Sequence, residues 1–449
     1  MSSTSTASIE PADEAPVATG ARAPTSSSQR FWTVLLLIAI AGLGLRVAYV
    51  LGAKRGEPMM GDAIYYNGQA VALAEGRGFT CPFPGTPSCP KKVPVADHPP
   101  LTALAMAPAS WLFPKDDTAQ RLSMTLIGTA GIVVIGMLGR SLAGERAGLI
   151  AAAIAAVYPN LWVNDGLIMS ETLAALTVAL ALLLAYRVAR RPSWTSVVAL
   201  GAVCGLAILT RAELGLLIPA VAIPVVFVAR GLATRRRVEL AAVIVLSAVV
   251  VIAPWVVPNM FRFKKPVYLS TNDGITLAGA NCPSVYSGKG LGLWTLDCQT
   301  APKGDQSQVD AYLRHRGLSY IRHHVGRLPI VIAAREGLVW GVFRPATMVA
   351  YNKGEGREPW VSWLGYAAYW ILVPLAAVGV LTLRRRRVMV WPLLAQFGIV
   401  VVTAAVFYGL WRFRIPVEVV LVVLAAVAID AFARRGARRG GGAHAAAPA

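Results

Sequence analysis

Charged residues are scarce in this sequence. Only 15% of its 449 residues are Asp, Glu, Lys or Arg, whereas 56% are hydrophobic. Soluble domains carry about 25% charged residues and use them to cover their surface. The scarcity excludes an ordinary soluble fold, and we expect lipid to be the main solvent of the chain.

Acidic residues are scarcer than basic ones, which gives a formal net charge of +20. A charge of this size could indicate a nucleic-acid partner. The arginines, however, form short clusters between hydrophobic segments, as the cytoplasmic loops of membrane proteins do, and we predict no nucleic-acid partner. The clusters are Arg187–Arg191, Arg230–Arg237, Arg384–Arg387 and Arg434–Arg439.

The chain has only five cysteines, and none are in the Cys-x-x-Cys spacing that favours zinc. Cys81 and Cys89 flank one loop, and Cys282 and Cys298 flank another. Pairing within each loop is the simplest of the three pairings that four cysteines allow, and an oxidising outer compartment permits it. Free thiols and metal ligation remain the alternatives. Cys204 lies in a hydrophobic segment, where we expect a small buried apolar residue.

Long hydrophobic runs, by contrast, are abundant. Residues 31–51 suffice to cross a hydrocarbon layer of ~30 Å at ~1.5 Å per residue. We predict about ten membrane-spanning helices in total. The other candidates are residues 120–140, 147–163, 167–187, 194–210, 212–230, 238–257, 361–383, 388–409 and 414–433.

One shorter run, Pro99–Phe113, contains three prolines. It would reach only ~22 Å as a helix. If it lies on the outer face, every arginine cluster falls on the cytoplasmic side. If it spans the membrane, several clusters move outside, against the preference of Lys and Arg for cytoplasmic loops. We therefore predict an interfacial helix here, with both termini in the cytoplasm.

This topology divides the chain into five parts. Residues 1–28 are rich in Ser, Thr, Ala and Pro, and we expect them to form a disordered cytoplasmic tail. They lack the basic segment and cleavage site of a signal peptide. The other parts are an N-terminal transmembrane catalytic module at 29–257 that includes a first extracytoplasmic loop at 52–119, a large extracytoplasmic loop at 258–360, C-terminal transmembrane helices at 361–433 and a basic cytoplasmic tail at 434–449.

Several polar motifs interrupt these hydrophobic segments in a fixed order. They are Asp62–Tyr66, Leu73–Phe79, His98–Leu101, Met169–Thr172, Leu209–Glu213, Ser270–Gly274 and Trp411–Pro416. Together they resemble the bacterial polyprenyl-phosphate-sugar glycosyltransferases of the GT-C fold, a superfamily that includes the protein O-mannosyltransferases and the aminoarabinose transferase of lipid A. The resemblance covers most of residues 31–433. It implies an all-α integral membrane bundle with interfacial helices on the extracytoplasmic face of the bacterial plasma membrane.

The resemblance also implies an enzyme. Such an enzyme moves a hexose or pentose from a polyprenyl-phosphate carrier to a glycan, lipid or protein acceptor of the cell envelope. With a single phosphate as leaving group, inversion is the expected outcome. A transporter or lipid flippase is the main alternative, but the sequence has no internal repeat and its polar residues gather on one face. A non-catalytic scaffold for envelope assembly also stays open.

Three carboxylates are candidates for the chemistry. Asp62 lies at the membrane interface beside the first span, positioned to take a proton from an acceptor; alternatively, it caps a helix that starts at Ala63. Glu171 matches the second acid of the resembled enzymes, in Ser-Glu-Thr. Asp165 is the other candidate, with a solvated turn residue in Asn-Asp-Gly as its alternative interpretation.

Four arginines are candidate substrate ligands. Arg412 and Arg414 lie where a lipid phosphate would sit, and a guanidinium fork matches phosphate oxygens; ordinary snorkelling to headgroups is the alternative. Arg46 lies within the first span and should face the bundle interior or a cavity. Arg211 could bind substrate or form a structural ion pair with Glu213.

Aromatic residues complete the predicted site. Tyr65 and Tyr66 could stack on sugar faces or anchor the chain at the membrane interface. His98 could bind substrate or ligate a metal, although a lone histidine is a poor metal signal. Because the resembled enzymes differ in their need for a divalent ion, we predict no certain cofactor and leave a divalent metal ion open.

Overall fold

The computed structural model describes residues 26–83 and 93–443. In this part of the chain, helices joined by loops account for the fold, with no strand and one isolated β-bridge between Thr80 and Pro94. The predicted all-α class is therefore confirmed. The predicted tail 1–28 lies outside the described residues except at Ser26–Ser28, where the first helix begins, and the last helix runs through the predicted tail 434–449 as far as Ala443.

Six of the described helices are long and apolar enough to cross a membrane, and a bent pair makes a seventh candidate. The six are α1 (Ser26–Tyr49, continued by a π-helical turn to Lys54), α4 (Asp117–Ala143), α7 (Glu171–Arg190), α10 (Thr234–Arg262), α15 (Pro359–Arg385) and α17 (Ile415–Ala443). The bent pair is α5 (Glu145–Val157) and α6 (Pro159–Asp165), which meet at 56°.

The remaining predicted spans are also helical but shorter. They are α8 (Trp194–Thr210), the segment Ala212–Val228 that ends in α9 (Ile223–Val228), and α16 (Trp391–Val406). Every span predicted from the sequence therefore corresponds to helix, whereas the number that crosses the membrane stays a prediction. The run at Pro99 forms α3 (Leu101–Leu112), which is also too short to count as a span.

Helix α17 is the centre of the bundle. It packs against α15, α5, α4 and α7. Of the most apolar 18 residues within Trp411–Arg435, 89% are buried inside the protein. The sequence of α17 explains this, because a helix that is apolar on all sides needs neighbours all round. Small residues let those neighbours approach closely. At Gly379 of α15, for example, a β-carbon would collide with the Leu424 carbonyl.

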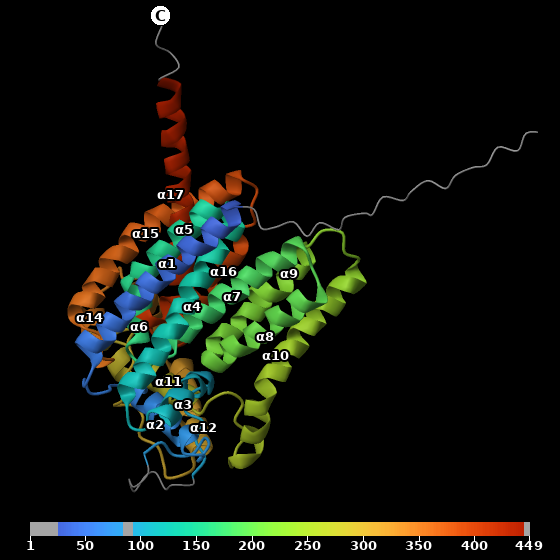
Figure 1. Cartoon of the computed structure of the whole chain (residues 1–449). Helices are drawn as coiled ribbons and strands as arrows, with labels where there is room; N and C mark the ends of the chain where they lie inside the picture. Colours follow the sequence, from blue (N-terminus) through green and yellow to red (C-terminus); the bar gives the residue numbers. More distant parts are fainter. Residues whose placement is uncertain (1–25, 84–92, 444–449) are drawn as a thin grey trace, which may run out of the picture.

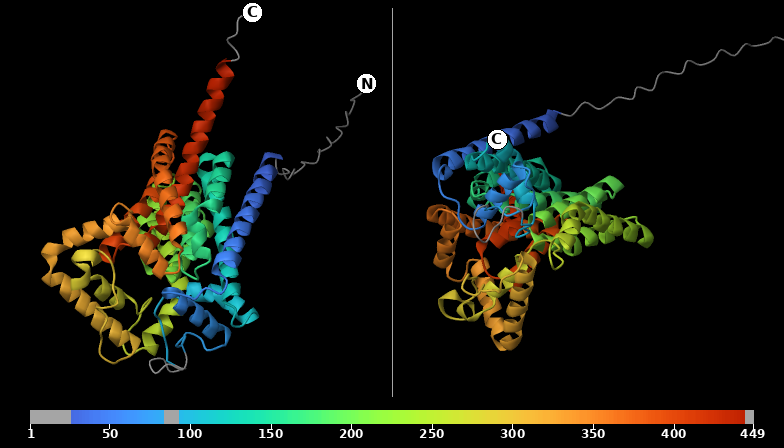
Figure 2. Two further views of the ribbon diagram at one scale, coloured as in Figure 1. Left: turned by 90° about the vertical axis from the view of Figure 1, so that its left-hand side faces the viewer. Right: turned by 90° about the horizontal axis from the view of Figure 1, so that it is seen from below.

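The two predicted loops gather at one end of the bundle (Figure 1). Helices α2 (Asp62–Ala74) and α3 from the first loop lie beside α11 (Asp273–Ala280) and α12 (Gln306–His323) from the second. The start of α1 and the end of α17 lie at the opposite end, as Figure 2 also shows. This matches the relative placement of loops and termini predicted from the arginine clusters; which end faces the cytoplasm stays a prediction.

The rest of the second loop forms α13 (Leu328–Val339) and α14 (Pro345–Gly354). A disulfide joins Cys282 to Cys298, which confirms this predicted pair. Cys89 lies outside the described residues, so its bond to Cys81 stays a prediction. Cys204 is a free, fully buried cysteine of α8, as expected for a small apolar residue.

Candidate active site

A cavity of about 450 Å³ opens at the end of the bundle where the loop helices gather. Its walls come from α2, the segment before α3, the start of α7, the α8–Ala212 junction, α11, α12 and the segment between α16 and α17. Six of the seven sequence motifs contribute a lining residue, and only Leu73–Phe79 does not. Motifs that are far apart in the sequence therefore converge on one site.

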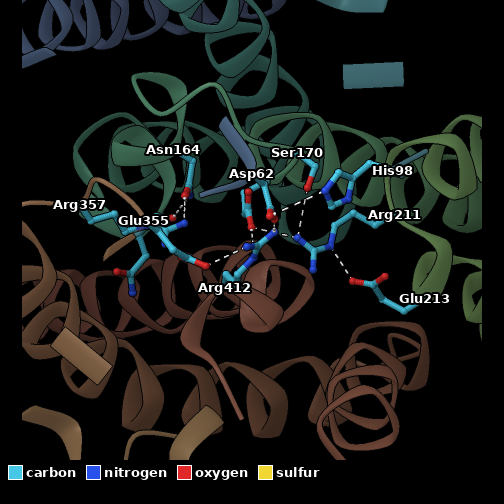
Figure 3. A network of polar contacts seen from close by, with 11 residues as sticks. Asp62, His98, Asn164, Ser170, Arg211, Glu213, Glu355, Arg357 and Arg412 are labelled. Atoms are coloured by element: carbon cyan, nitrogen blue, oxygen red, sulfur yellow. Dashed lines mark hydrogen bonds and ion pairs between the residues drawn. The ribbon is translucent and has the colours of Figure 1, made fainter. Parts of the chain in front are cut away.

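Arg412 is the centre of the polar network at this cavity (Figure 3). It lies in a short 3₁₀-helix, Trp411–Arg414, that leads into α17. Its Nη2 is 2.8 Å from Asp62 Oδ2 and its Nη1 is 2.8 Å from Glu355 Oε1, both as hydrogen bonds. Its Nε is 2.8 Å from Glu171 Oε1, an ion pair without hydrogen-bond geometry. One guanidinium thus joins three carboxylates from three separate segments.

Asp62 is the first residue of α2 and lines the cavity. Gly61 before it has a φ of 58°, which only glycine adopts freely, and this turn aims the helix start at the cavity. The Asp62 carboxylate makes no cap hydrogen bond, so the capping interpretation is wrong; it contacts Arg412 instead. Burial alone would raise the pKa of Asp62, but the Arg412 guanidinium beside it holds the pKa well below its usual range.

Glu171 is the first residue of α7 and is fully buried. Arg211 reaches it with Nη1 at 2.9 Å and also donates to Ser170 Oγ at 3.2 Å. The turn before α7 contains Ile168 at a φ of 56°, a conformation that β-branched residues rarely adopt and that clusters at functional sites. The predicted Arg211–Glu213 ion pair is present at 2.6 Å, and both residues line the cavity.

The ring of His98 contacts the rings of Tyr65 and Tyr66, which also contact each other. The ring centre of His98 is 5.1 Å from that of Tyr65 and 5.0 Å from that of Tyr66, and its Nε2 is 3.8 Å from Asp62 Oδ1. Tyr66 and His98 line the cavity, whereas Tyr65 lies behind them. Burial raises the pKa of both phenols, which keeps them neutral. Both rings are buried inside the protein, so the membrane-anchor interpretation is wrong.

Arg46 and Asp165 form a separate ion pair away from the cavity. Arg46 Nε is 2.6 Å from Asp165 Oδ2, and both side chains are only 2% exposed. Arg46 also donates to the carbonyls of Ala155 and Ala156 in the last turn of α5, which the break before Pro159 leaves without helical partners. The solvated-turn interpretation of Asp165 is therefore wrong, because the bend between α5 and α6 turns this residue inward.

Arg414 also lies outside the cavity. It pairs with Glu418 at 3.0 Å, and its guanidinium stands 4.0 Å from the Tyr369 ring centre. It is 1% exposed, so snorkelling to headgroups is excluded. Arg412 and Arg414 are two residues apart, yet the tight turns of the 3₁₀-helix send their side chains to different places. The structure brings Arg412 to the candidate base and leaves Arg414 in the core.

Sequence reasoning missed the turn after α14. Glu355 there contacts Arg412 and pairs with Arg357, whose Nη2 is 3.0 Å from Asn164 Oδ1. Three charged residues within Glu355–Glu358, directly before a span, were the available signal. Among the described residues, no group of three or more His, Cys, Asp or Glu side chains is arranged to hold a metal ion. The question of a divalent ion stays open.

The helical arrangement is similar to that of the oligosaccharyltransferase AglB from Archaeoglobus fulgidus. The complex of AglB with an inhibitory peptide and a dolichol-phosphate matches at a TM-score of 0.54 and 14% identity, over 94% of this chain and 53% of AglB. The apo form matches at 0.52 and 14%, over 91% and 51%. This chain thus spans about half the length of AglB. The protein is a multi-pass membrane protein with the fold of the GT-C glycosyltransferases, as its motifs predicted.

A comparison of the sequence with protein families finds a match for part of the chain. Residues 97–257 match the family model described as dolichyl-phosphate-mannose-protein mannosyltransferase. ArnT from Cupriavidus metallidurans bound to undecaprenyl phosphate is a weaker structural match, at a TM-score of 0.44 and 17% identity over 91% of this chain and 78% of ArnT. No curated protein sequence matches the chain.

Proposed function

We propose that the protein is an integral-membrane glycosyltransferase that moves a sugar from a polyprenyl-phosphate carrier to a glycan, lipid or protein acceptor. The observation that carries this proposal is the Arg412 guanidinium, held beside the Asp62 carboxylate on the wall of one cavity. The match over residues 97–257, to a family named for a dolichyl-phosphate sugar, supports a lipid-phosphate donor. The dolichol-phosphate bound to AglB, which shares the fold, is consistent with it.

The proposed reaction is a direct displacement. Asp62 accepts the proton of an acceptor hydroxyl, whose oxygen forms a bond to the anomeric carbon of the sugar. The bond between that carbon and the phosphate oxygen breaks, and its electron pair leaves with the lipid phosphate. Arg412 stabilises the charge that develops on this phosphate. Because the acceptor attacks opposite the leaving group, the anomeric configuration inverts.

The other candidate residues have supporting roles in this proposal. Glu171 is a positioning residue, because its carboxylate holds Arg412 and Arg211 together. Arg211 adds positive charge at the cavity, and Tyr66 and His98 offer ring faces to the sugar. We assign the remaining candidates to the scaffold behind the site. They are Tyr65, Arg46, Asp165 and Arg414.

The proposed location is the extracytoplasmic face of a bacterial plasma membrane, with both termini in the cytoplasm. The arginine clusters support it, because three of them lie in or next to the last turns of α7, α15 and α17, away from the loop helices that form the cavity. A cavity on the outer face would receive a sugar carried by a polyprenyl phosphate and an acceptor of the cell envelope.

A transfer assay tests the proposal. Purified protein is given a panel of radiolabelled polyprenyl-phosphate sugars, together with envelope glycan, lipid and protein fractions. We expect one sugar to be transferred by the wild type and not by Asp62→Asn or Arg412→Gln. Asp297→Asn and Arg322→Gln remove exposed charges of the second loop and are matched controls. Equal transfer by all variants would rule out this cavity as the active site.

A further inference from the structure

The Arg412 guanidinium is already occupied by the protein's own carboxylates. Asp62 and Glu171 take its Nη2–Nε edge and Glu355 takes Nη1. A phosphate that used the same edge in a bidentate way would have to replace a carboxylate there. Of the three acids, only Asp62 lines the cavity. A ligand that approaches the guanidinium from the cavity therefore meets Asp62 first.

The three carboxylates also differ in what holds them. Glu171 is fully buried and has a second cation, Arg211, at 2.9 Å. Glu355 is 15% exposed and has Arg357 as a second partner. Asp62 is 32% exposed, and its other neighbour is His98 at 3.8 Å, which is charged only if protonated. Releasing a buried carboxylate from its cation is costly, whereas Asp62 can be solvated in the cavity.

We propose that the phosphate of the lipid-linked donor displaces Asp62 from Arg412, and that this displacement turns Asp62 into the base of the reaction. The inference rests on the proposed function and adds an order to it. The donor binds first, and only then can an acceptor hydroxyl lose its proton. In the free protein the same contact keeps the base inactive.

The electrostatics of Asp62 fit this arrangement. Arg412, His98 and Arg211 lie near the carboxylate, and the other titratable groups that interact with it are the phenols of Tyr66 and Tyr408 and the carboxyl group of Asp97. While Arg412 is its partner, the pKa of Asp62 is low, and a carboxylate with a low pKa is a weak general base. Once the phosphate neutralises Arg412, the strongest influence that lowers the pKa of Asp62 is lost, and the pKa rises.

A binding measurement tests the displacement, because it predicts that removing the candidate base strengthens phosphate binding. The probe is undecaprenyl monophosphate, titrated into the purified full-length protein, with phosphate-free undecaprenol as the control for the lipid tail. We expect Asp62→Asn to bind the monophosphate about tenfold more tightly than the wild type, the scale of one charge-assisted hydrogen bond that no longer competes. Glu355→Gln and Glu171→Gln should show no such gain.

The variants separate the outcomes. Tighter binding by Glu355→Gln alone, or equal binding by the three variants and the wild type, would overturn the displacement of Asp62. The proposed function would survive either result if Arg412→Gln still abolished the binding that depends on phosphate. No such binding by the wild type would overturn both. Asp62→Ser, which also removes the charge, repeats the test if Asp62→Asn does not purify as a folded protein.

Discussion

Two largely buried arginines of this protein, Arg46 and Arg412, can be compared directly. Arg46 meets one carboxylate, Asp165, and its remaining donors go to backbone carbonyls of α1 and α5. Arg412 meets three carboxylates and lines a cavity of about 450 Å³. The first arrangement is satisfied within the protein and stabilises a helix break. The second concentrates charge where a ligand can reach it. The active site therefore differs from the scaffold in two ways: a ligand can reach its guanidinium from a cavity, and three carboxylates rather than one surround that guanidinium.

The largest expected effect is a loss of catalytic rate when Asp62, the partner of Arg412 at the cavity, is changed. Asp62→Asn removes the proposed base and should lower kcat by about 10²–10⁴-fold, the usual contribution of a positioned acid or base. The thermal unfolding temperature should change little, because Asp62 is partly exposed. Transfer kinetics and a melting curve on the same preparation provide the test. A variant that retains most of its kcat would remove Asp62 from the chemistry.

For the buried ion pair Arg46–Asp165 we expect the opposite result, a loss of stability with little loss of activity. Arg46→Met leaves the Asp165 carboxylate buried without its cation, and breaking a buried ion pair costs about 3–5 kcal/mol of stability. The unfolding temperature should fall strongly, while the folded fraction keeps a kcat near that of the wild type. The double variant Arg46→Met with Asp165→Leu should recover part of the loss. A stable variant without activity would place this pair in the active site.

Glu355 should have an intermediate effect, because it positions Arg412 without lining the cavity. Glu355→Gln loses one charge-assisted hydrogen bond, so we expect kcat to fall about tenfold with little change in KM. Glu355→Asp, which keeps the charge, should recover part of the rate. If KM rises instead and kcat stays constant, Glu355 contributes to donor binding and not to positioning.

The smallest expected effect is on stability at low pH. The pKa of Asp62 is lowered in the folded protein, so its ion pair stabilises the fold above the unfolded pKa of about 3.9 and loses this contribution as the pH falls toward the folded pKa. The difference in unfolding temperature between the wild type and Asp62→Asn should be constant from about pH 5 to 8 and narrow below about pH 4. A difference that widened on acidification would contradict the sign of the shift.

Much of the site follows from the sequence because its motifs are local. Asp62, His98, Glu171, Arg211 and Arg412 each stand in a short polar motif at the end of an apolar run, and all of them meet. Which arginine of the last motif faces the cavity could not be predicted, since that depends on the 3₁₀ geometry of four residues.

Two further features depend on contacts between distant segments. The role of Glu355 requires the turn after α14 to pack against the start of α17, which no local pattern in a loop predicts. The burial of Asp165 depends on the bend between α5 and α6. Spans, by contrast, are predictable because lipid imposes one length and one composition on each of them.

A structure of the wild type with a bound polyprenyl phosphate tests the central claim most directly. The account predicts a phosphate oxygen within about 3 Å of the Arg412 guanidinium. It also predicts that the Asp62 carboxylate has left Arg412 and faces the sugar side of the cavity. A phosphate bound away from Arg412, or one bound while the Asp62–Arg412 ion pair stays intact, would contradict it.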